Sequence, residues 1–166
     1  MIDLSPTPMA PIAPDRIVEG PAMLLAGLRR VHAFATAAES ITEQWRAFRA
    51  IGTLPGQRGT AAYGVLCGAD PQAQTFEYMT GAEVASFDGL SAEYGRMRIP
   101  AQRYAVFAHR GPAATLHLAW DAIWNDWIPR SGHQPANTPE FEVYDERFDP
   151  RTGTGLIEVW ASILPA

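Results

Sequence analysis

Glu158 is the residue of this sequence whose position points most directly to chemistry. It lies in the apolar segment 155–164, whose β-branched and aromatic residues predict a half-buried strand. Because side chains alternate between the two faces of a strand, Leu156, Glu158 and Trp160 share one face. If that face is solvated, Glu158 is an ordinary exposed residue. If it is covered, an unpaired carboxylate is costly, and Glu158 needs a cationic or hydrogen-bonding partner or a ligand.

Patterns for several other chemistries are missing. The sequence has four histidines without a His-Glu-x-x-His pair: His32, His109, His117 and His133. Since Cys67 is the single cysteine, no structural zinc site is predicted. Residues 131–133 lack the Gly-x-Ser-x-Gly elbow of hydrolases and indicate a helix-terminating turn. Residues 153–155 lie between predicted strands and indicate a hairpin loop, not a phosphate-binding loop. We therefore expect no metal and no nucleotide cofactor.

Composition sets the broad class of protein. The chain has 166 residues, of which 47% are apolar, and this is enough for one domain with a sizeable core. The net charge of -5 argues against sequence-independent nucleic-acid binding, which needs clustered Lys and Arg. A signal-peptide pattern is missing, and no apolar run approaches the roughly 20 residues that span a bilayer. We therefore expect a soluble cytoplasmic protein that binds neither nucleic acid nor membrane.

The elements that must position Glu158 follow from prolines, glycines and apolar spacing. The prolines of the opening segment predict an extended arm over residues 1–15. Residues 17–34 are expected to be extended, with an interruption at Pro21. A capping box at 40–43 predicts the start of a helix that ends at Gly52. Two strands are predicted next, at 62–67 and 75–84.

The second half repeats this order of elements. It contains a predicted strand at 103–109, a helix at about 116–129 and two strands at 141–148 and 156–164. Trp45 corresponds to Trp124, and Glu77 corresponds to Glu158, at offsets of about 80 residues. The repeat predicts an α+β fold with a duplicated strand-helix-strand-strand unit. We expect a single domain over 16–166, with half-repeats at about 16–90 and 91–166.

Four stretches of sequence, taken in order, resemble the GyrI-like small-molecule-binding family. They are YAVFAHRG at 104–111, WDAIWNDWIPRSG at 120–132, PEFEVY at 139–144 and IEVW at 157–160. The family includes effector-binding domains of bacterial AraC-type regulators and multidrug-sensing regulators. The resemblance covers about residues 16–166. It implies that the strands form one curved antiparallel sheet and that two main helices frame a central ligand cleft.

The resemblance also implies which residues bind ligand. The glutamate matching Glu158 often sits at the base of the cleft and meets cationic or polar ligand groups. Tyr144 matches the tyrosine of the family's Phe-Glu-x-Tyr segment, and Glu77 is the expected pseudo-symmetric mate of Glu158. Four tryptophans complete the candidate site: Trp120, Trp124, Trp127 and Trp160. Of the three on the helix, we expect chiefly Trp124 to reach the cleft.

These features predict a stand-alone protein that captures or senses lipophilic, cationic or aromatic compounds. Aromatic walls and a buried carboxylate attract such cations. The short arm leaves no room for a helix-turn-helix module, so direct DNA binding is not expected. Two alternatives stay open. The first is an enzyme: some members of the family hydrolyse strained cyclopropanoid electrophiles, and here Glu158 and Tyr144 would activate or position water. The second is an inhibitor of the gyrase-inhibitor type, which would act on a protein partner.

Overall fold

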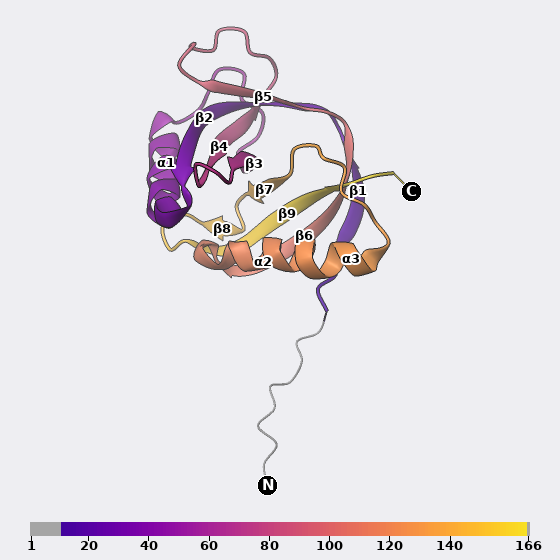
Figure 1. Ribbon diagram of the computed structural model, residues 1–166. Coiled ribbons are helices and arrows are strands. Elements are labelled where there is room, and N and C mark those ends of the chain that lie inside the picture. Colours follow the sequence, from indigo (N-terminus) through magenta and orange to yellow (C-terminus); the bar gives the residue numbers. More distant parts are fainter. Residues whose placement is uncertain (1–10, 166) are drawn as a thin grey trace.

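The computed structural model describes residues 11–165 and contains one curved sheet with helices packed against it (Figure 1). Its strands are β1 (Arg16–Gly20), β2 (Met23–Ala33), β3 (Ala62–Asp70), β4 (Thr75–Val84), β5 (Gly95–Ile99), β6 (Gln102–Pro112), β7 (Phe141–Tyr144), β8 (Phe148–Asp149) and β9 (Thr154–Ile163). Its helical elements are η1 (Phe34–Thr36), α1 (Ala37–Ile51), η2 (Ala113–Thr115), α2 (Leu116–Ala122), the π-helical turn η3 (Ile123–Trp127) and α3 (Ile128–Ser131).

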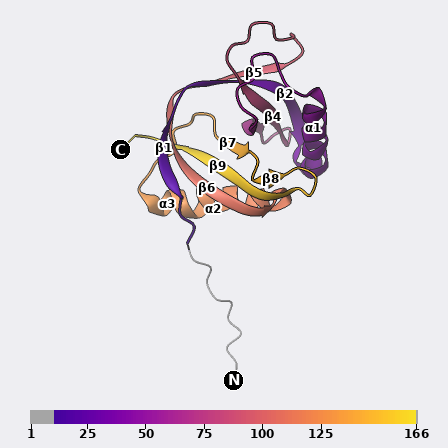
Figure 2. The ribbon, with the colours of Figure 1, turned by 180° about the vertical axis from the view of Figure 1, so that it is seen from behind.

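All nine strands belong to a single antiparallel sheet. The order is β1-β6-β9-β7-β3-β4-β2-β5, and β8 pairs with β9. Helix α1 packs on β2 and β4, whereas α2 lies over β6. Figures 1 and 2 show α1 at one end of the sheet and the α2–α3 segment at the other. This arrangement confirms the predicted α+β fold with a curved antiparallel sheet and two main helices.

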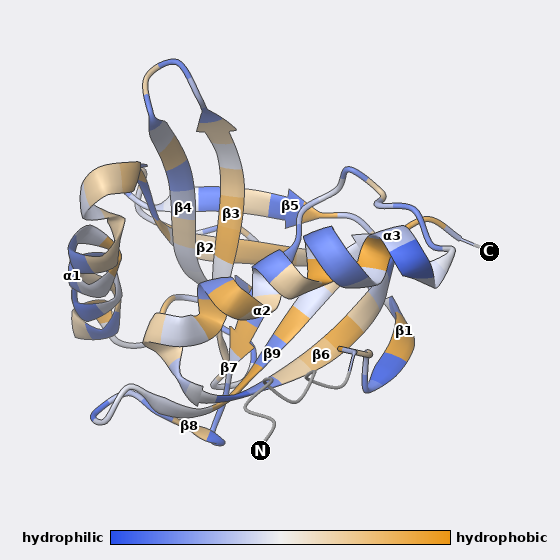
Figure 3. Cartoon of the chain, turned by 60° about the horizontal axis from the view of Figure 1, so that its bottom comes forward, coloured by the Kyte–Doolittle hydropathy of each residue, from blue (hydrophilic) through white to orange (hydrophobic). Residues whose placement is uncertain are grey.

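The sheet buries apolar residues on both faces. In β9, Ile157 and Val159 join the core beneath the helices, whereas Trp160 packs on the opposite side. We call these two sides the helix face and the far face. The far face has its own buried cluster: Leu25, Val65, Met79, Ile99, Tyr104, Val106 and Phe141. Figure 3 shows the resulting apolar bands along the strands and the hydrophilic residues on α1. Strand alternation thus decides which core a side chain enters.

The bounds of the elements repeat at a constant offset along the chain. Strands β1, β2 and β4 begin at Arg16, Met23 and Thr75, and the matching strands β5, β6 and β9 each begin the same distance further along. The duplication is thereby confirmed. The offset matches Glu158 with Met79 instead of Glu77, so the predicted pairing of the two glutamates is wrong by two positions. Sequence letters alone did not show where each strand begins.

The first strand of each repeat pairs with the other repeat. β1 belongs to the first repeat but is hydrogen-bonded to β6 of the second, and β5 of the second repeat is hydrogen-bonded to β2 of the first. The pairing of β3 with β7 also crosses between the repeats. The two halves are therefore interleaved in one sheet.

The predicted start of the first helix is wrong by one turn. Helix α1 begins at Ala37, directly after the short turn η1, so Ser40 already lies in the first helical turn. Its hydroxyl oxygen is 3.2 Å from the carbonyl oxygen of Thr36, which precedes the helix. Ser40 is thus not the N-cap residue that a capping box requires.

The predicted arm at 1–15 falls mostly outside the described part of the chain. Residues 11–15 form neither helix nor strand, and residues 1–10 are not described. Between residues 11 and 165, no helix is both long and apolar enough to span a bilayer.

Candidate functional site

A buried carboxylate, Glu142, lies on the helix face of the sheet. Its neighbours in β7, Phe141 and Val143, pack on the far face, so alternation directs Glu142 toward the helices. The register agrees, because Glu142 is paired with Val159 of the helix-face core. Glu142 is only 7% exposed. A carboxylate at this depth needs hydrogen-bond donors or a cation.

Two tyrosines supply the donors to Glu142. The hydroxyl of Tyr144 donates to one carboxylate oxygen at 2.7 Å, and the hydroxyl of Tyr78 donates to the other at 3.2 Å. Tyr144 belongs to the same strand as Glu142, two positions on, and therefore shares its face. Tyr78 comes from β4, which is separated from β7 by β3 in the sheet. The two halves of the chain thus meet at this acid.

Aromatic rings surround the tyrosines. Trp45 of α1 packs edge-on against Tyr144 with ring centroids 4.7 Å apart, and it also contacts Tyr78 at 6.5 Å. Phe148 also packs edge-on against Tyr144, with ring centroids 5.1 Å apart. Gly64 of β3 provides the space, since a Cβ atom there would overlap the Tyr78 hydroxyl. The acid is enclosed by aromatic side chains from both repeats.

Burial controls the charge of this site. It raises the pKa of Glu142 to about 7, although hydrogen bonds from Tyr144, Tyr78 and Trp120 favour the charged form. Burial also raises the pKa of Tyr78 and of Tyr144 well above their usual range, and the nearby Glu142 charge adds to this. The tyrosines therefore stay protonated as donors. Glu142 can gain or lose a proton near neutral pH, which suits a site that binds a cation or transfers a proton.

Glu158, the leading candidate from the sequence, lies on the far face. Its carboxylate accepts hydrogen bonds from Arg16 at 2.7 and 3.2 Å and from the indole N–H of Trp160 at 3.2 Å. Arg147 lies 3.6 Å away. Burial favours a higher pKa for Glu158, but the hydrogen bonds and the positive charges of both arginines outweigh it and lower the pKa. The cationic partner that a covered Glu158 requires is therefore Arg16.

Two further candidates share the far face with Glu158. Trp160 stacks on Phe141 with ring centroids 5.4 Å apart and has the Arg16 guanidinium 5.7 Å above its ring. Glu77 forms an ion pair with Arg29. A ligand role for these residues stays a prediction, and the sheet separates them from Glu142.

The tryptophans of the second helix take three different environments. Trp120 is half-buried against the helix-face core, and its indole helps to lower the pKa of Glu142. Trp124 is 41% exposed, lies 5.0 Å from the Trp120 ring and donates to Glu140 at 3.2 Å. Trp127 is buried and packs edge-on against Phe107. The structure thus brings Trp120 and Tyr144 to the acid, with Trp124 beside them.

The sequence did not identify Glu142, Tyr78 or Trp45 as site residues. A signal was present, because Glu142 and Tyr144 alternate with apolar residues in the same predicted strand, as Glu158 and Trp160 do. The sequence does not show which face of each strand lies under the helices.

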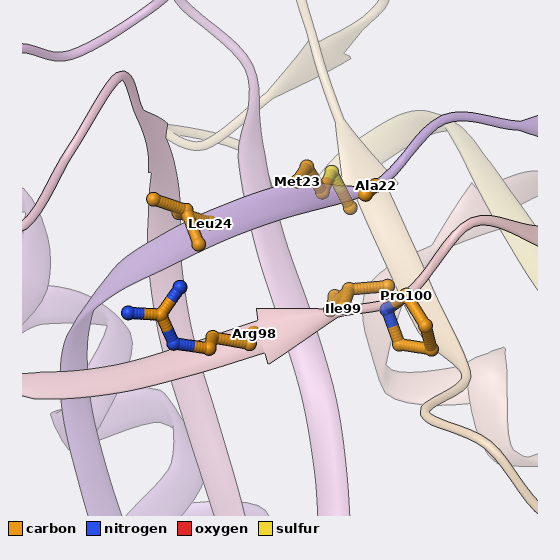
Figure 4. Close-up of a pocket in the computed structure, with 6 residues that line it drawn as sticks. All are labelled: Ala22, Met23, Leu24, Arg98, Ile99 and Pro100. Atoms are coloured by element: carbon orange, nitrogen blue, oxygen red, sulfur yellow. The ribbon is translucent and has the colours of Figure 1, made fainter.

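Open hollows occur away from Glu142, whose aromatic neighbours are nearly all buried. One of about 350 Å³ lies between the ends of β2 and β5 and is shown in Figure 4. It is lined by Ala22, Met23, Leu24, Arg98, Ile99 and Pro100. Within residues 11–165, His, Cys, Asp and Glu side chains do not gather as they would around a metal ion. The enclosed acid is therefore the chemically distinctive feature of the fold.

Similar proteins agree with this architecture. The transcriptional regulator BrlR of Pseudomonas aeruginosa is 31% identical over 153 residues, which cover 85% of this chain and 53% of BrlR. The chain thus spans about half the length of that relative. The structure of SAV2435 bound to tetraphenylphosphonium has a TM-score of 0.67 at 16% identity and covers 90% of this chain and 93% of that one. A hydrolase from Listeria innocua has a TM-score of 0.57 at 12% identity and covers 94% of both chains.

The match to a protein family extends over almost all described residues. A family model described as the GyrI-like small molecule binding domain matches residues 15–164. The fold, with its duplicated units and curved antiparallel sheet, is that of the solved structures above. This chain therefore belongs to the GyrI-like family of small-molecule-binding domains.

Proposed function

We propose that this domain binds lipophilic aromatic cations at Glu142. The observation that carries the proposal is a buried carboxylate whose side-chain donors, among the described residues, are two tyrosine hydroxyls. Among residues 11–165, no arginine or histidine forms an ion pair with it. A carboxylate buried without a cation is costly in its charged form, so an entering positive charge is stabilised. The rings of Trp45, Tyr78 and Tyr144 add cation–π attraction.

The ligand-binding glutamate is thus Glu142 and not Glu158, which was predicted from the sequence. A cation at Glu158 would have to displace the guanidinium of Arg16, which already makes two hydrogen bonds to that carboxylate. At Glu142 a ligand competes only with uncharged donors. The original hypothesis of an aromatic site with a buried glutamate is kept, with a different glutamate.

Ligand entry requires side chains to move. Trp45, Tyr78 and Tyr144 are each less than one-tenth exposed, so the rings fill the space beside the acid. Trp120 is half-buried and lies in α2, shortly before the π-helical turn η3. π-helical turns interrupt the regular hydrogen bonding of a helix and are frequent at functional sites. We expect this helical segment to shift when ligand binds.

The relatives support both the ligand class and a sensing role. Tetraphenylphosphonium, bound to SAV2435, is an aromatic lipophilic cation. BrlR is a transcriptional regulator, and its matched region covers about half of its length. A domain of this kind that senses such cations would report their presence to a regulatory partner.

Hydrolysis is the second candidate function, and it has its own supporting observation. A glutamate with a pKa of about 7 beside a tyrosine hydroxyl is suited to general acid-base catalysis near neutral pH. The hydrolase from Listeria innocua shares the fold. Strained electrophiles remain the expected substrate class. Product in excess of one equivalent, lost in both Glu142→Gln and Tyr144→Phe, would establish this activity over simple binding.

Calorimetry with a matched pair of ligands tests the binding proposal. Tetraphenylphosphonium carries the charge, and triphenylphosphine oxide is a neutral aromatic analogue. Glu142→Gln should weaken binding of the cation by more than about tenfold and change binding of the neutral compound little, because it preserves shape and removes charge. Glu158→Gln is the control and should leave both affinities near those of the wild type. Loss of cation binding in Glu158→Gln alone would restore the original hypothesis.

A further inference from the structure

A second polar cluster lies apart from Glu142, at the start of helix α1. His32, at the end of β2, is only 3% exposed. One ring nitrogen, Nδ1, lies 2.7 Å from the Ser40 hydroxyl, and the other, Nε2, lies 2.5 Å from the Gln44 side-chain oxygen. Ser40 and Gln44 are one helical turn apart in α1. A hydroxyl, an imidazole and an amide therefore form a continuous chain of hydrogen bonds.

The bonds of Gln44 fix where the imidazole carries its proton. The amide nitrogen of Gln44 is 3.0 Å from the backbone oxygens of both Leu28 and Tyr78, which can only accept. The amide oxygen must therefore face His32, and Nε2 of His32 must be the donor to it. In the neutral ring, Nδ1 then has a free lone pair. Nδ1 lies 2.7 Å from the Ser40 oxygen, and the hydroxyl can rotate to this lone pair from the more distant backbone oxygens of Thr36 and Ala37, as in an activated nucleophile.

The internal duplication provides a comparison for this cluster. At the offset that relates the two repeats, the positions of His32, Ser40 and Gln44 are occupied by Gly111, Ala119 and Ile123. Ile123 is fully buried in the helix-face core. The second repeat thus builds the same strand, turn and helix without any of the three polar groups. The fold does not require them, although buried polar groups are costly unless fully bonded.

Aromatic residues lie next to the imidazole. His32 contacts Phe76 with ring centroids 5.5 Å apart, and Phe76 stacks on Phe34 at the same separation. Phe34 is 51% exposed, and Ser40 is partly exposed. An exposed ring beside a hydroxyl–imidazole pair favours a small ligand with a flat apolar group.

We propose that Ser40 is a nucleophile, activated by His32, that accepts acyl groups from small aryl esters. The Ser40 oxygen forms a bond to the ester carbonyl carbon, and its proton moves to Nδ1 of His32. The bond from that carbon to the aryl oxygen then breaks, and the proton on Nδ1 passes to the departing phenolate. His32 then takes a proton from water, and the water oxygen bonds to the acyl carbon. The bond from that carbon to the Ser40 oxygen breaks, the proton on Nδ1 returns to Ser40, and the acid leaves. Gln44 is a positioning residue, since it holds the tautomer.

p-Nitrophenyl acetate is the probe, with the full chain as the enzyme. Release of p-nitrophenolate is followed by absorbance, and acid-quenched samples are mapped by peptide mass spectrometry. The sequence contains no lysine, so side-chain amines cannot compete for the acetyl group. The expected results are p-nitrophenolate release above the buffer rate and acetyl on Ser40. Ser40→Ala should slow the release by about 10²-fold or more.

Controls separate this activity from folding and from the Glu142 site. Ser40→Ala installs the residue that the second repeat has, so it should fold and bind tetraphenylphosphonium as the wild type does. Thr42→Ala removes a neighbouring hydroxyl that bonds only to the Ala38 carbonyl, and it should keep the full rate. His32→Ala should lose the activity and regain part of it with added imidazole. Equal release by Ser40→Ala and wild type, or acetyl found only on other residues, would overturn the proposal.

Discussion

Glu142→Gln should stabilise the ligand-free protein, and the gain should grow with pH. Burial raises the pKa of Glu142 from its ordinary 4.5 to about 7 in the folded protein. The folded state therefore binds this proton more tightly than the unfolded state. The contribution of Glu142 to stability is therefore largest below pH 4.5, is lost as the pH rises toward 7, and is constant above 7. The gap between the two pKa values corresponds to about 3 kcal/mol.

Glutamine keeps the shape of the side chain and cannot ionise. Relative to Glu142→Gln, the wild type should lose about 3 kcal/mol between pH 4.5 and 7, and its melting temperature at pH 8 should be lower by about 6–12 °C. Near pH 4.5 the two proteins should differ by little more than one hydrogen bond, about 1 kcal/mol. Urea unfolding at half-unit pH steps, with linear extrapolation, gives the comparison.

Glu158→Gln provides a control with the opposite sign. The pKa of Glu158 is lowered in the folded protein, so its contribution to stability is present above its unfolded pKa and is lost as the pH falls. The two variants should therefore diverge from the wild type in opposite directions. A difference between wild type and Glu142→Gln that stays constant from pH 5 to pH 8 would refute the raised pKa, and with it the physical basis for the Glu142 site.

Three other changes have distinct expected results. Gly64→Ala places a Cβ against the Tyr78 hydroxyl, so it should lower the unfolding free energy by about 1–3 kcal/mol in urea and weaken tetraphenylphosphonium binding. Unchanged stability and affinity would contradict the close packing. Arg16→Met leaves the Glu158 carboxylate without its main donor and should lower the unfolding free energy by about 1–2 kcal/mol at pH 7. The loss is modest because the guanidinium is partly exposed, and Arg16→Lys should restore part of it. Trp120→Phe should remove most of the ligand-dependent fluorescence change and Trp124→Phe less, whereas the reverse order would support the original choice of Trp124.

The sequence predicted the elements well because local signals control them. Alternating apolar residues located most of the strands, and helical spacing located both helices. Strand β5 was not predicted, and the single strand predicted at 141–148 is divided into β7 and β8. Local signals could not distinguish Glu142 from Glu158 as the site residue, since both acids lie between apolar residues in predicted strands. Helices cover one of them and Arg16, 142 residues away in sequence, pairs with the other. Long-range pairing of this type leaves no local signature.

The three tryptophans of the second helix show a second limit of prediction from sequence. A regular helix places Trp120, Trp124 and Trp127 near one another on one side. The π-helical turn η3 inserts extra residues per turn between them, which changes the phase of the helix. Trp127 consequently faces the core while Trp124 remains 41% exposed. A fixed period of about 3.6 residues could not predict this.

The interleaving of the two repeats has a consequence for folding. Strand β1 pairs with β6, which comes after the whole of the first repeat in sequence. Strand β5 of the second repeat pairs with β2 of the first. Such pairings give the domain a high contact order, which predicts slow folding because distant segments must meet before the sheet edges close. Neither repeat can complete its own sheet, so both should unfold together in one cooperative transition. A chain cut between β4 and β5 should yield two fragments that fold only when mixed, because the first strand of each fragment pairs with a strand of the other.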